Sequence, residues 1–151
     1  MKKNKSFSLI EILIILTIIG IISGIGFFIF NQIQPKIQLN GTARELITDL
    51  RYAQQLAVSE QTKYGVFFST TTPETPDEYK LIKYGTETEE IFVKKLPEKI
   101  NFYQIIGFAN QEVVFNPYGA VQEEGKIILI NNQNTTTTID VRPSGFVKKL
   151  D

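Results

Sequence analysis

The sequence contains no cysteine and no histidine among its 151 residues. Without cysteine the chain can form no disulfide, no thiol nucleophile and no cysteine-ligated metal site. Without histidine it lacks the commonest general base near neutral pH and the commonest metal ligand. These absences argue against most hydrolase mechanisms, and we predict no catalytic residue, no metal site, no cofactor and no enzymatic activity.

Neither sign of charge is in excess, since lysine plus arginine and aspartate plus glutamate both number 16. A general nucleic-acid-binding protein would show a basic excess, so this class is not favoured. The charges are unevenly placed, because Lys2, Lys3 and Lys5 crowd the first six residues.

Charged residues are almost absent from residues 7 to 30, where Glu11 is the only one. As a helix this segment is long enough to cross the ~30 Å hydrocarbon core of a bilayer. A secretory signal peptide is one alternative, but its apolar core is only about 7–15 residues long. A simple signal anchor is another, but it does not explain Glu11. We expect a transmembrane or filament-core helix over residues 7–34.

Residues from about 31 to 60 show the apolar spacing of an amphipathic helix. The apolar positions are Ala43, Leu46, Ile47, Leu50, Ala53, Leu56 and Ala57, and the other face carries Arg44, Glu45, Asp49, Arg51 and Gln55. Thr42 with Glu45 resembles a capping box. Pro35 and Gly41 either kink one continuous helix or separate two.

From Thr62 onward the apolar period changes to that of strands separated by turn signals. Strands are expected at Tyr64–Ser69, Tyr79–Tyr84, Ile91–Leu96, Ile100–Ile105, Glu112–Phe115, Lys126–Ile130 and Thr137–Val141. The short gaps predict an antiparallel, meander-like sheet. A helix followed by strands alone predicts an α+β fold with the helix packed on one sheet face. The expected parts are therefore residues 1–6, 7–34, 35–61 and 62–151.

The segment around Ser6, Phe7 and Glu11 is the most informative part of the sequence. A charge at the centre of a membrane helix costs about 2.5–3.5 kcal/mol, and less near an end, so Glu11 needs a partner. A cut between Ser6 and Phe7 would give Phe7 a positively charged amino terminus. That group could pair with Glu11 of the same or a neighbouring subunit and favour one packing register.

This segment resembles the class III signal of type IV prepilins and type II secretion pseudopilins. That signal has a short basic leader, a small residue before the cut, a phenylalanine, a glutamate four residues further on, and a long apolar run. The resemblance implies that a prepilin peptidase cuts between Ser6 and Phe7, that Phe7 is N-methylated and that Glu11 is the assembly glutamate. The family usually has glycine where this chain has Ser6.

A weaker similarity links the rest of the chain to H-type minor pseudopilins and related minor pilins. It rests on the segment from Leu50 to Gln54, on Tyr64-Gly65-Val66, on Gly119, and on the closing residues Val141–Val147 with Gly145. Many relatives have a proline within the apolar helix, whereas this chain has Gly20, Gly24 and Gly26 in that region.

The resemblance implies a minor subunit of a type II secretion pseudopilus or a type IV pilus-like filament. Its expected partners are the prepilin peptidase, other pilin or pseudopilin subunits, an inner-membrane assembly platform and, before assembly, membrane lipid. The basic leader would stay in the cytoplasm and the head would lie outside as a single-pass protein. Alternatives are a major pilin, a DNA-uptake minor pilin and a signal-anchored binding domain that never polymerises.

Two clusters of charge receive simpler interpretations. Arg142, Lys148 and Lys149 could contact DNA, but Phe146 follows Gly145 where DNA-binding relatives usually have arginine, so a solvated end is favoured. Glu87, Glu89 and Glu90 are expected in a solvated turn, because no metal-ligand spacing surrounds them.

Overall fold

The computed structural model describes residues 8–70 and 77–150, without the side chains of residues 25–29 and 31. The chain divides into two compact units, Met1–Gln34 and Pro35–Asp151. The second unit is called the head below. The fold is α+β, as predicted, and the described residues form one long helix and eight strands in antiparallel sheets.

The helix α1 runs without interruption from Leu9 to Ser59. Pro35 lies inside it and Gly41 remains helical, so neither residue separates two helices. The predicted capping box is wrong, because Thr42 is in the helix interior. Its hydroxyl donates to the carbonyl of Gln38 at 3.0 Å. Inside the helix the backbone N–H of Glu45 has an intrahelical acceptor, so no unpaired N–H is left there for Thr42 to cap.

In the first unit, every described side chain from residue 8 to residue 24 is exposed. These side chains are nearly all apolar and lie on all sides of the helix. Among the described residues, no helix has both the length and the apolarity needed to cross a membrane.

The head contains two four-stranded sheets. The first has the order β3-β2-β1-β5 and the second the order β4-β6-β7-β8, and all pairs are antiparallel. The strands are β1 Lys63–Ser69, β2 Glu78–Tyr84, β3 Thr88–Lys95, β4 Ile100–Ile106, β5 Glu112–Phe115, β6 Gly125–Asn131, β7 Thr136–Val141 and β8 Val147–Leu150. A short 3-10 helix, η1, spans Ala109–Gln111.

The single meander expected from the sequence is wrong, because the chain changes sheet three times, before β4, before β5 and before β6. β4 pairs with β6 in the second sheet, whereas β5 pairs with β1 in the first sheet. Hairpin-sized gaps do not reveal such exchanges, since they depend on which apolar faces meet in the core. The structure also adds β8 and starts β3 at Thr88, so Glu89 and Glu90 are strand residues.

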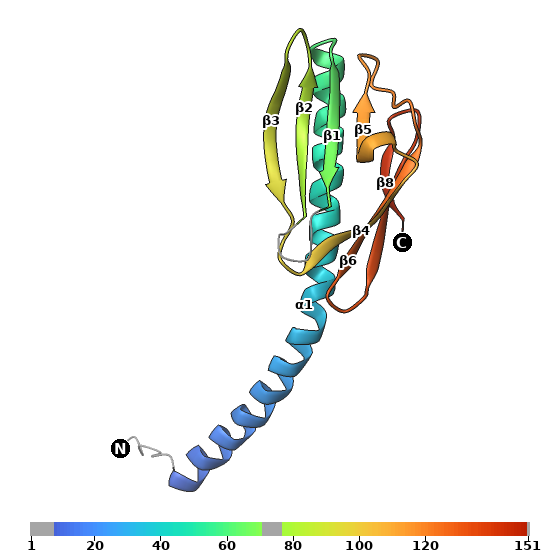
Figure 1. Ribbon diagram of the computed structural model, residues 1–151. Helices are drawn as coiled ribbons and strands as arrows, with labels where there is room; N and C mark the ends of the chain where they lie inside the picture. Colours follow the sequence, from blue (N-terminus) through green and yellow to red (C-terminus); the bar gives the residue numbers. More distant parts are fainter. Residues whose placement is uncertain (1–7, 71–76, 151) are drawn as a thin grey trace, which may run out of the picture. The chain divides into compact units, whose positions relative to one another are not determined.

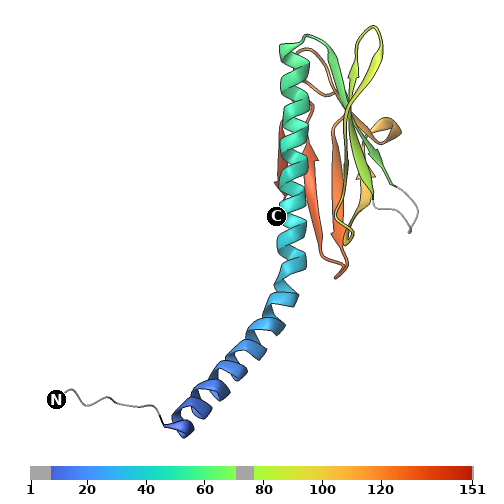
Figure 2. The ribbon, with the colours of Figure 1, turned by 90° about the vertical axis from the view of Figure 1, so that its left-hand side faces the viewer.

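The part of α1 in the head packs against the sheets, as predicted. Its buried side chains are Leu39, Ala43, Leu46, Ile47, Leu50, Ala53 and Ala57, and they join one apolar core with strand residues such as Tyr64, Phe68, Leu81, Ile127 and Leu129. Figure 1 shows this part of α1 behind β1 and β2, and Figure 2 shows it along one side of the strands. Because Ala43, Ala53 and Ala57 have short side chains, the helix backbone can approach the sheets closely.

Candidate processing and assembly site

Glu11 lies in the first turn of α1 and is exposed. The carbonyl of Ser8 accepts the backbone N–H of Glu11 at 3.0 Å and that of Ile12 at 3.3 Å, so Ser8 marks the start of the helix. A carboxylate here interacts favourably with the positive end of the helix dipole. Its described neighbours along the helix, Ile10 and Ile12 among them, are exposed and apolar.

Ser6 and Phe7 lie outside the described residues. The ion pair between the Phe7 amino group and Glu11 therefore stays a prediction. Glu11 has the accessibility that such a pair would require, because nothing in the described part of the chain covers it.

The helix residues singled out by the weaker similarity contact two glycine turns. Gln54 donates its amide N–H to the carbonyl of Gly119 at 2.7 Å, and the Arg51 guanidinium donates to the carbonyl of Val147 at 2.9 Å. Gly145 has φ +77°, and a side chain there would collide with the Gly119 carbonyl and the Gln54 amide. Gln54, Gly119 and Gly145 therefore form one contact, which fastens the two turns to α1. The helical pattern placed Arg51 on a solvated face, and it missed this role.

Asp49 was also expected on the polar face of the helix, but it is buried. Its carboxylate accepts the Tyr79 hydroxyl and an ammonium N–H of Lys94 at 2.7 Å. Burial and this hydrogen bond raise the pKa of Tyr79 far above its ordinary value. The spacing could have predicted this burial, because Asp49 lies three residues after Leu46 and four before Ala53, both of which are buried.

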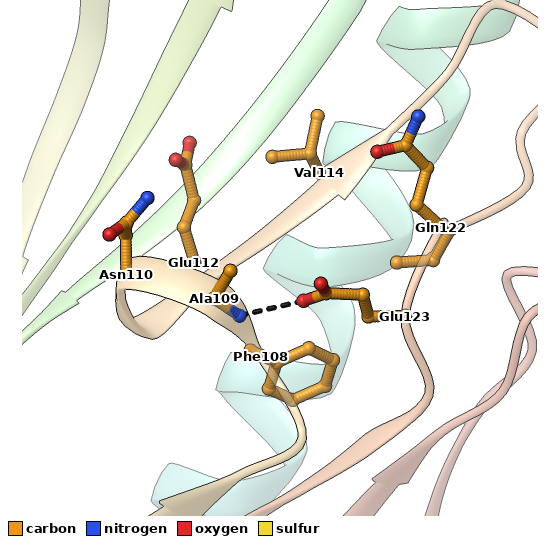
Figure 3. A pocket seen from close by; sticks show the side chains of 8 residues that line it. Phe108, Ala109, Asn110, Glu112, Val114, Gln122 and Glu123 are labelled. Carbon is orange, nitrogen blue, oxygen red and sulfur yellow. Dashed lines mark hydrogen bonds between the residues drawn. The ribbon is translucent and has the colours of Figure 1, made fainter.

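A small pocket of ≈ 130 Å³ lies between η1, β5 and the loop before β6. Figure 3 shows Glu112 and Glu123 among its lining residues, with Glu123 accepting the backbone N–H of Ala109 at 2.6 Å. Within residues 8–70 and 77–150, no group of three or more acidic side chains could hold a metal ion.

The charge clusters near the end of the head are partly neutralised. The Arg142 guanidinium lies 3.3 Å from the Asp140 carboxylate, and Lys148 and Lys149 are half-buried strand residues of β8. Glu90 pairs with Lys80 at 3.2 Å. The basic cluster is therefore not an open, unpaired surface.

Comparison with known proteins connects these observations. Residues 1–27 match the family model of the prokaryotic N-terminal methylation motif. The fold resembles the minor pseudopilin EpsH of the Vibrio cholerae type 2 secretion system, with TM-score 0.62 and 10% identity over 75% of this chain and 96% of that one. It also resembles the type IV minor pilin FimU of Pseudomonas aeruginosa, with TM-score 0.60 and 12% identity over 77% of this chain and 90% of that one.

The chain therefore combines an N-terminal methylation motif with a pilin-like fold. No curated protein matches its sequence. The methylation motif of this pilin-like chain contains all three predicted site residues, Ser6, Phe7 and Glu11. The individual roles of these residues remain predictions.

Proposed function

We propose that this pilin-like chain is a structural filament subunit, processed by a prepilin peptidase that cuts between Ser6 and Phe7 and methylates the new amino terminus. The observation that carries the proposal is the combination of a methylation motif over residues 1–27 with a pilin-like head. A peptidase signal alone would fit other precursors, and a pilin-like head alone would not imply processing. The proposed role is structural and not enzymatic.

The exposed apolar helix supports assembly as the purpose of processing. A helix that is apolar on all sides is stable in water only when lipid or protein covers it. In a filament, the helices of like subunits would provide this cover. The charge of Glu11 would then be satisfied by a Phe7 ammonium, which favours correct register because an unpaired charge in such a bundle is costly.

The location before assembly is proposed from the N-terminal motif and not from the helix itself. The lysine-rich leader would remain in the cytoplasm, since positive charge flanks the cytoplasmic side of an insertion signal. The head would lie outside, and an inner-membrane assembly platform would transfer the processed subunit to the filament.

A minor position in a type II secretion pseudopilus or a type IV pilus-like filament is favoured over a major one. Both structures compared above are minor subunits by name. A major pilin and a DNA-uptake minor pilin remain the alternatives within the filament class.

Intact-mass analysis of the full chain, expressed with and without a prepilin peptidase, tests the proposal. We expect the peptidase to yield a species that begins at Phe7 and carries one added methyl group. We also expect this species to co-purify with sheared filaments at a level well below that of the main subunit. A chain that still begins at Met1 in the presence of the peptidase would contradict the processing step.

A further inference from the structure

The last part of α1 and two turns of the head form a surface that carries almost no charge. It consists of residues 51–59 of the helix, residues 116–120 after β5 and residues 143–146 before β8. Arg51 is the only charged residue in these three segments, although 21% of the residues in the chain are charged. This surface is called the Arg51 surface below.

Large apolar side chains are exposed on the Arg51 surface. Tyr118 is 88% exposed, Phe146 is 51% exposed and Val58 is 44% exposed. Aromatic residues and arginine are enriched at the centre of protein–protein interfaces, whereas lysine, glutamate and aspartate are depleted there. The composition therefore indicates a surface that another protein covers, because exposed apolar groups without interspersed charges are typical of such sites.

The two turns are held rigidly on the helix. The Gln54 amide donates to the carbonyl of Gly119 at 2.7 Å, and Gly119 lies directly against Val58. Gly145 lies so close to the Gly119 carbonyl that a side chain there would collide with it. Because both turns are fixed to α1 and to each other, the surface would lose little conformational entropy when a partner binds.

A pocket of ≈ 310 Å³ opens on this surface, and Arg51, Gln55, Ser144 and Phe146 are among its lining residues. The Arg51 guanidinium donates one hydrogen bond, to the Val147 carbonyl at 2.9 Å, and its other N–H groups have no acceptor among the described residues. Gln55 and Ser144 add neutral donors. A guanidinium presents several donors in one plane and binds carboxylates especially well, so the pocket suits a carboxylate.

A carboxylate that meets Arg51 has to come from a surface that is itself poor in charge, since uncharged groups surround Arg51. Within the described part of the head, no exposed carboxylate meets this condition. Glu45, Glu60 and Glu90 pair with lysines, and every other exposed glutamate lies within two residues of another charge. A second copy of this chain is therefore a poor match, and the surface fits a different chain.

We propose that the Arg51 surface binds the head of a different pilin-like subunit, which places one carboxylate beside Arg51 and Phe146 and covers Tyr118 and Val58 with apolar side chains. The apolar cover excludes water from the ion pair, which strengthens it and makes the contact selective. Each copy makes this contact once and to another kind of chain, which agrees with a low-abundance position. The inference rests on the proposed filament function and deepens it by assigning a surface and the chemistry of its partner.

Photo-cross-linking from position 146 tests the contact. In cells that assemble the filament, Phe146 of the full-length chain is replaced by benzoylphenylalanine, a photoreactive aromatic analogue. We expect illumination to join the chain to one other subunit in the sheared-filament fraction. Mass spectrometry of the joined peptides should identify a different chain that has its own N-terminal methylation motif, and the joined segment should contain an aspartate or a glutamate.

Substitutions on the Arg51 surface provide the second arm. Arg51→Glu should lower the cross-link yield about tenfold or more, because it opposes two carboxylates. Replacing the carboxylate residue of the joined segment with arginine should restore the yield, and this rescue would not occur if Arg51→Glu had merely damaged the fold.

Tyr118→Ser tests the apolar part of the contact without risk to the core, because Tyr118 is 88% exposed. It should lower the cross-link yield about fivefold or more. Tyr103→Ser is the matched control and should leave the yield unchanged, since Tyr103 is also an exposed tyrosine but lies on β4, outside the Arg51 surface.

Four results would overturn the inference. If the chain enters filaments but gives no joined product, or joins only to a second copy of itself, the assigned contact is wrong and the proposed function stands. If it joins to a protein without a methylation motif, the surface binds something other than a filament subunit. If the chain does not enter filaments, the proposed function fails and this inference fails with it.

Discussion

At the scale of single residues, Glu11 is the residue on which the proposed assembly depends most. Its assembly role stays a prediction, which rests on the cost of a lone carboxylate at the edge of an apolar run and its need for a partner. The burial of Asp49 was not predicted, because aspartate is usually solvent-exposed and is buried here only with Tyr79 and Lys94 as partners. The contact of Arg51 with Val147 joins residues far apart in the chain, so no local pattern could reveal it.

Replacing Glu11 with alanine should leave processing intact and stop assembly. The peptidase site lies upstream, and the change makes the apolar helix more apolar, so membrane insertion is retained. Without the carboxylate, the Phe7 ammonium is left unpaired among apolar helices. We expect intact mass to show a normal mature chain and sheared filaments to contain less than about a tenth of the wild-type amount. Glu45→Ala is the control, and equal incorporation of the two variants would contradict the role of Glu11.

Leu50 is fully buried in the core that α1 forms with the two sheets, so its truncation should destabilise the head. We expect Leu50→Ala to lower the free energy of unfolding by about 2–5 kcal/mol. Arg44→Ala, on the exposed face of the same helix, should change it by less than about 0.5 kcal/mol. Urea denaturation followed by circular dichroism measures both, and similar midpoints would mean that this face does not pack as described. A substitution of Arg51 would not serve as the control, because the Arg51 guanidinium donates a hydrogen bond to the carbonyl of Val147 in β8.

The raised pKa of Tyr84 predicts that the free energy of unfolding decreases at alkaline pH. Burial and a hydrogen bond to Glu112 raise the pKa of Tyr84 to about 12, from the ordinary value of 10.0. Because the folded state holds this proton more tightly, the stabilisation is complete below pH 10 and is lost as pH rises from 10 toward 12. We expect the urea midpoint of wild type to fall more between pH 9 and pH 11 than that of Tyr84→Phe, which lacks the titrating group. Parallel changes in the two proteins would remove Tyr84 from the explanation.

At the scale of elements, α1 and most strands followed from periodicity, whereas the division into two sheets did not. Period two indicates that a segment is a strand, but the partner of each strand is decided by tertiary packing. β8 has only four residues, and Lys148 and Lys149 are two of them, so its local signal was weak. Pro35 left the continuity of α1 open, because a proline within a helix permits either outcome.

Two glycines of the head should respond to alanine in opposite directions. Gly145 has φ +77° and touches the Gly119 carbonyl, so Gly145→Ala combines backbone strain with a collision. We expect a loss of at least about 1–3 kcal/mol in the free energy of unfolding. Gly41 is helical with nothing near its missing side chain, so Gly41→Ala should stabilise the head by up to about 1 kcal/mol. Thermal unfolding of both variants decides this, and a stabilised Gly145→Ala would contradict the described turn.

At the scale of the whole molecule, the two units differ in how far their apolar side chains are buried. The described side chains of residues 8–24 are exposed and mostly apolar, and nothing within residues 8–70 and 77–150 covers them. The head encloses its own apolar core, to which α1 and both sheets contribute. A filament subunit requires this division, since one part must be buried among copies and the other must remain folded in water.

The head should therefore fold alone when the chain begins at Pro35. The boundary falls before Leu39, which is 1% exposed and belongs to the core. We expect residues 35–151 to form a soluble, cooperatively unfolding protein whose circular dichroism shows more strand than helix. A fragment that begins at Asn40 omits Leu39 and should be less stable by at least about 2 kcal/mol, because the space Leu39 fills is left open. If residues 35–151 stayed unfolded, or if the two fragments were equally stable, the core would not begin where the structure places it.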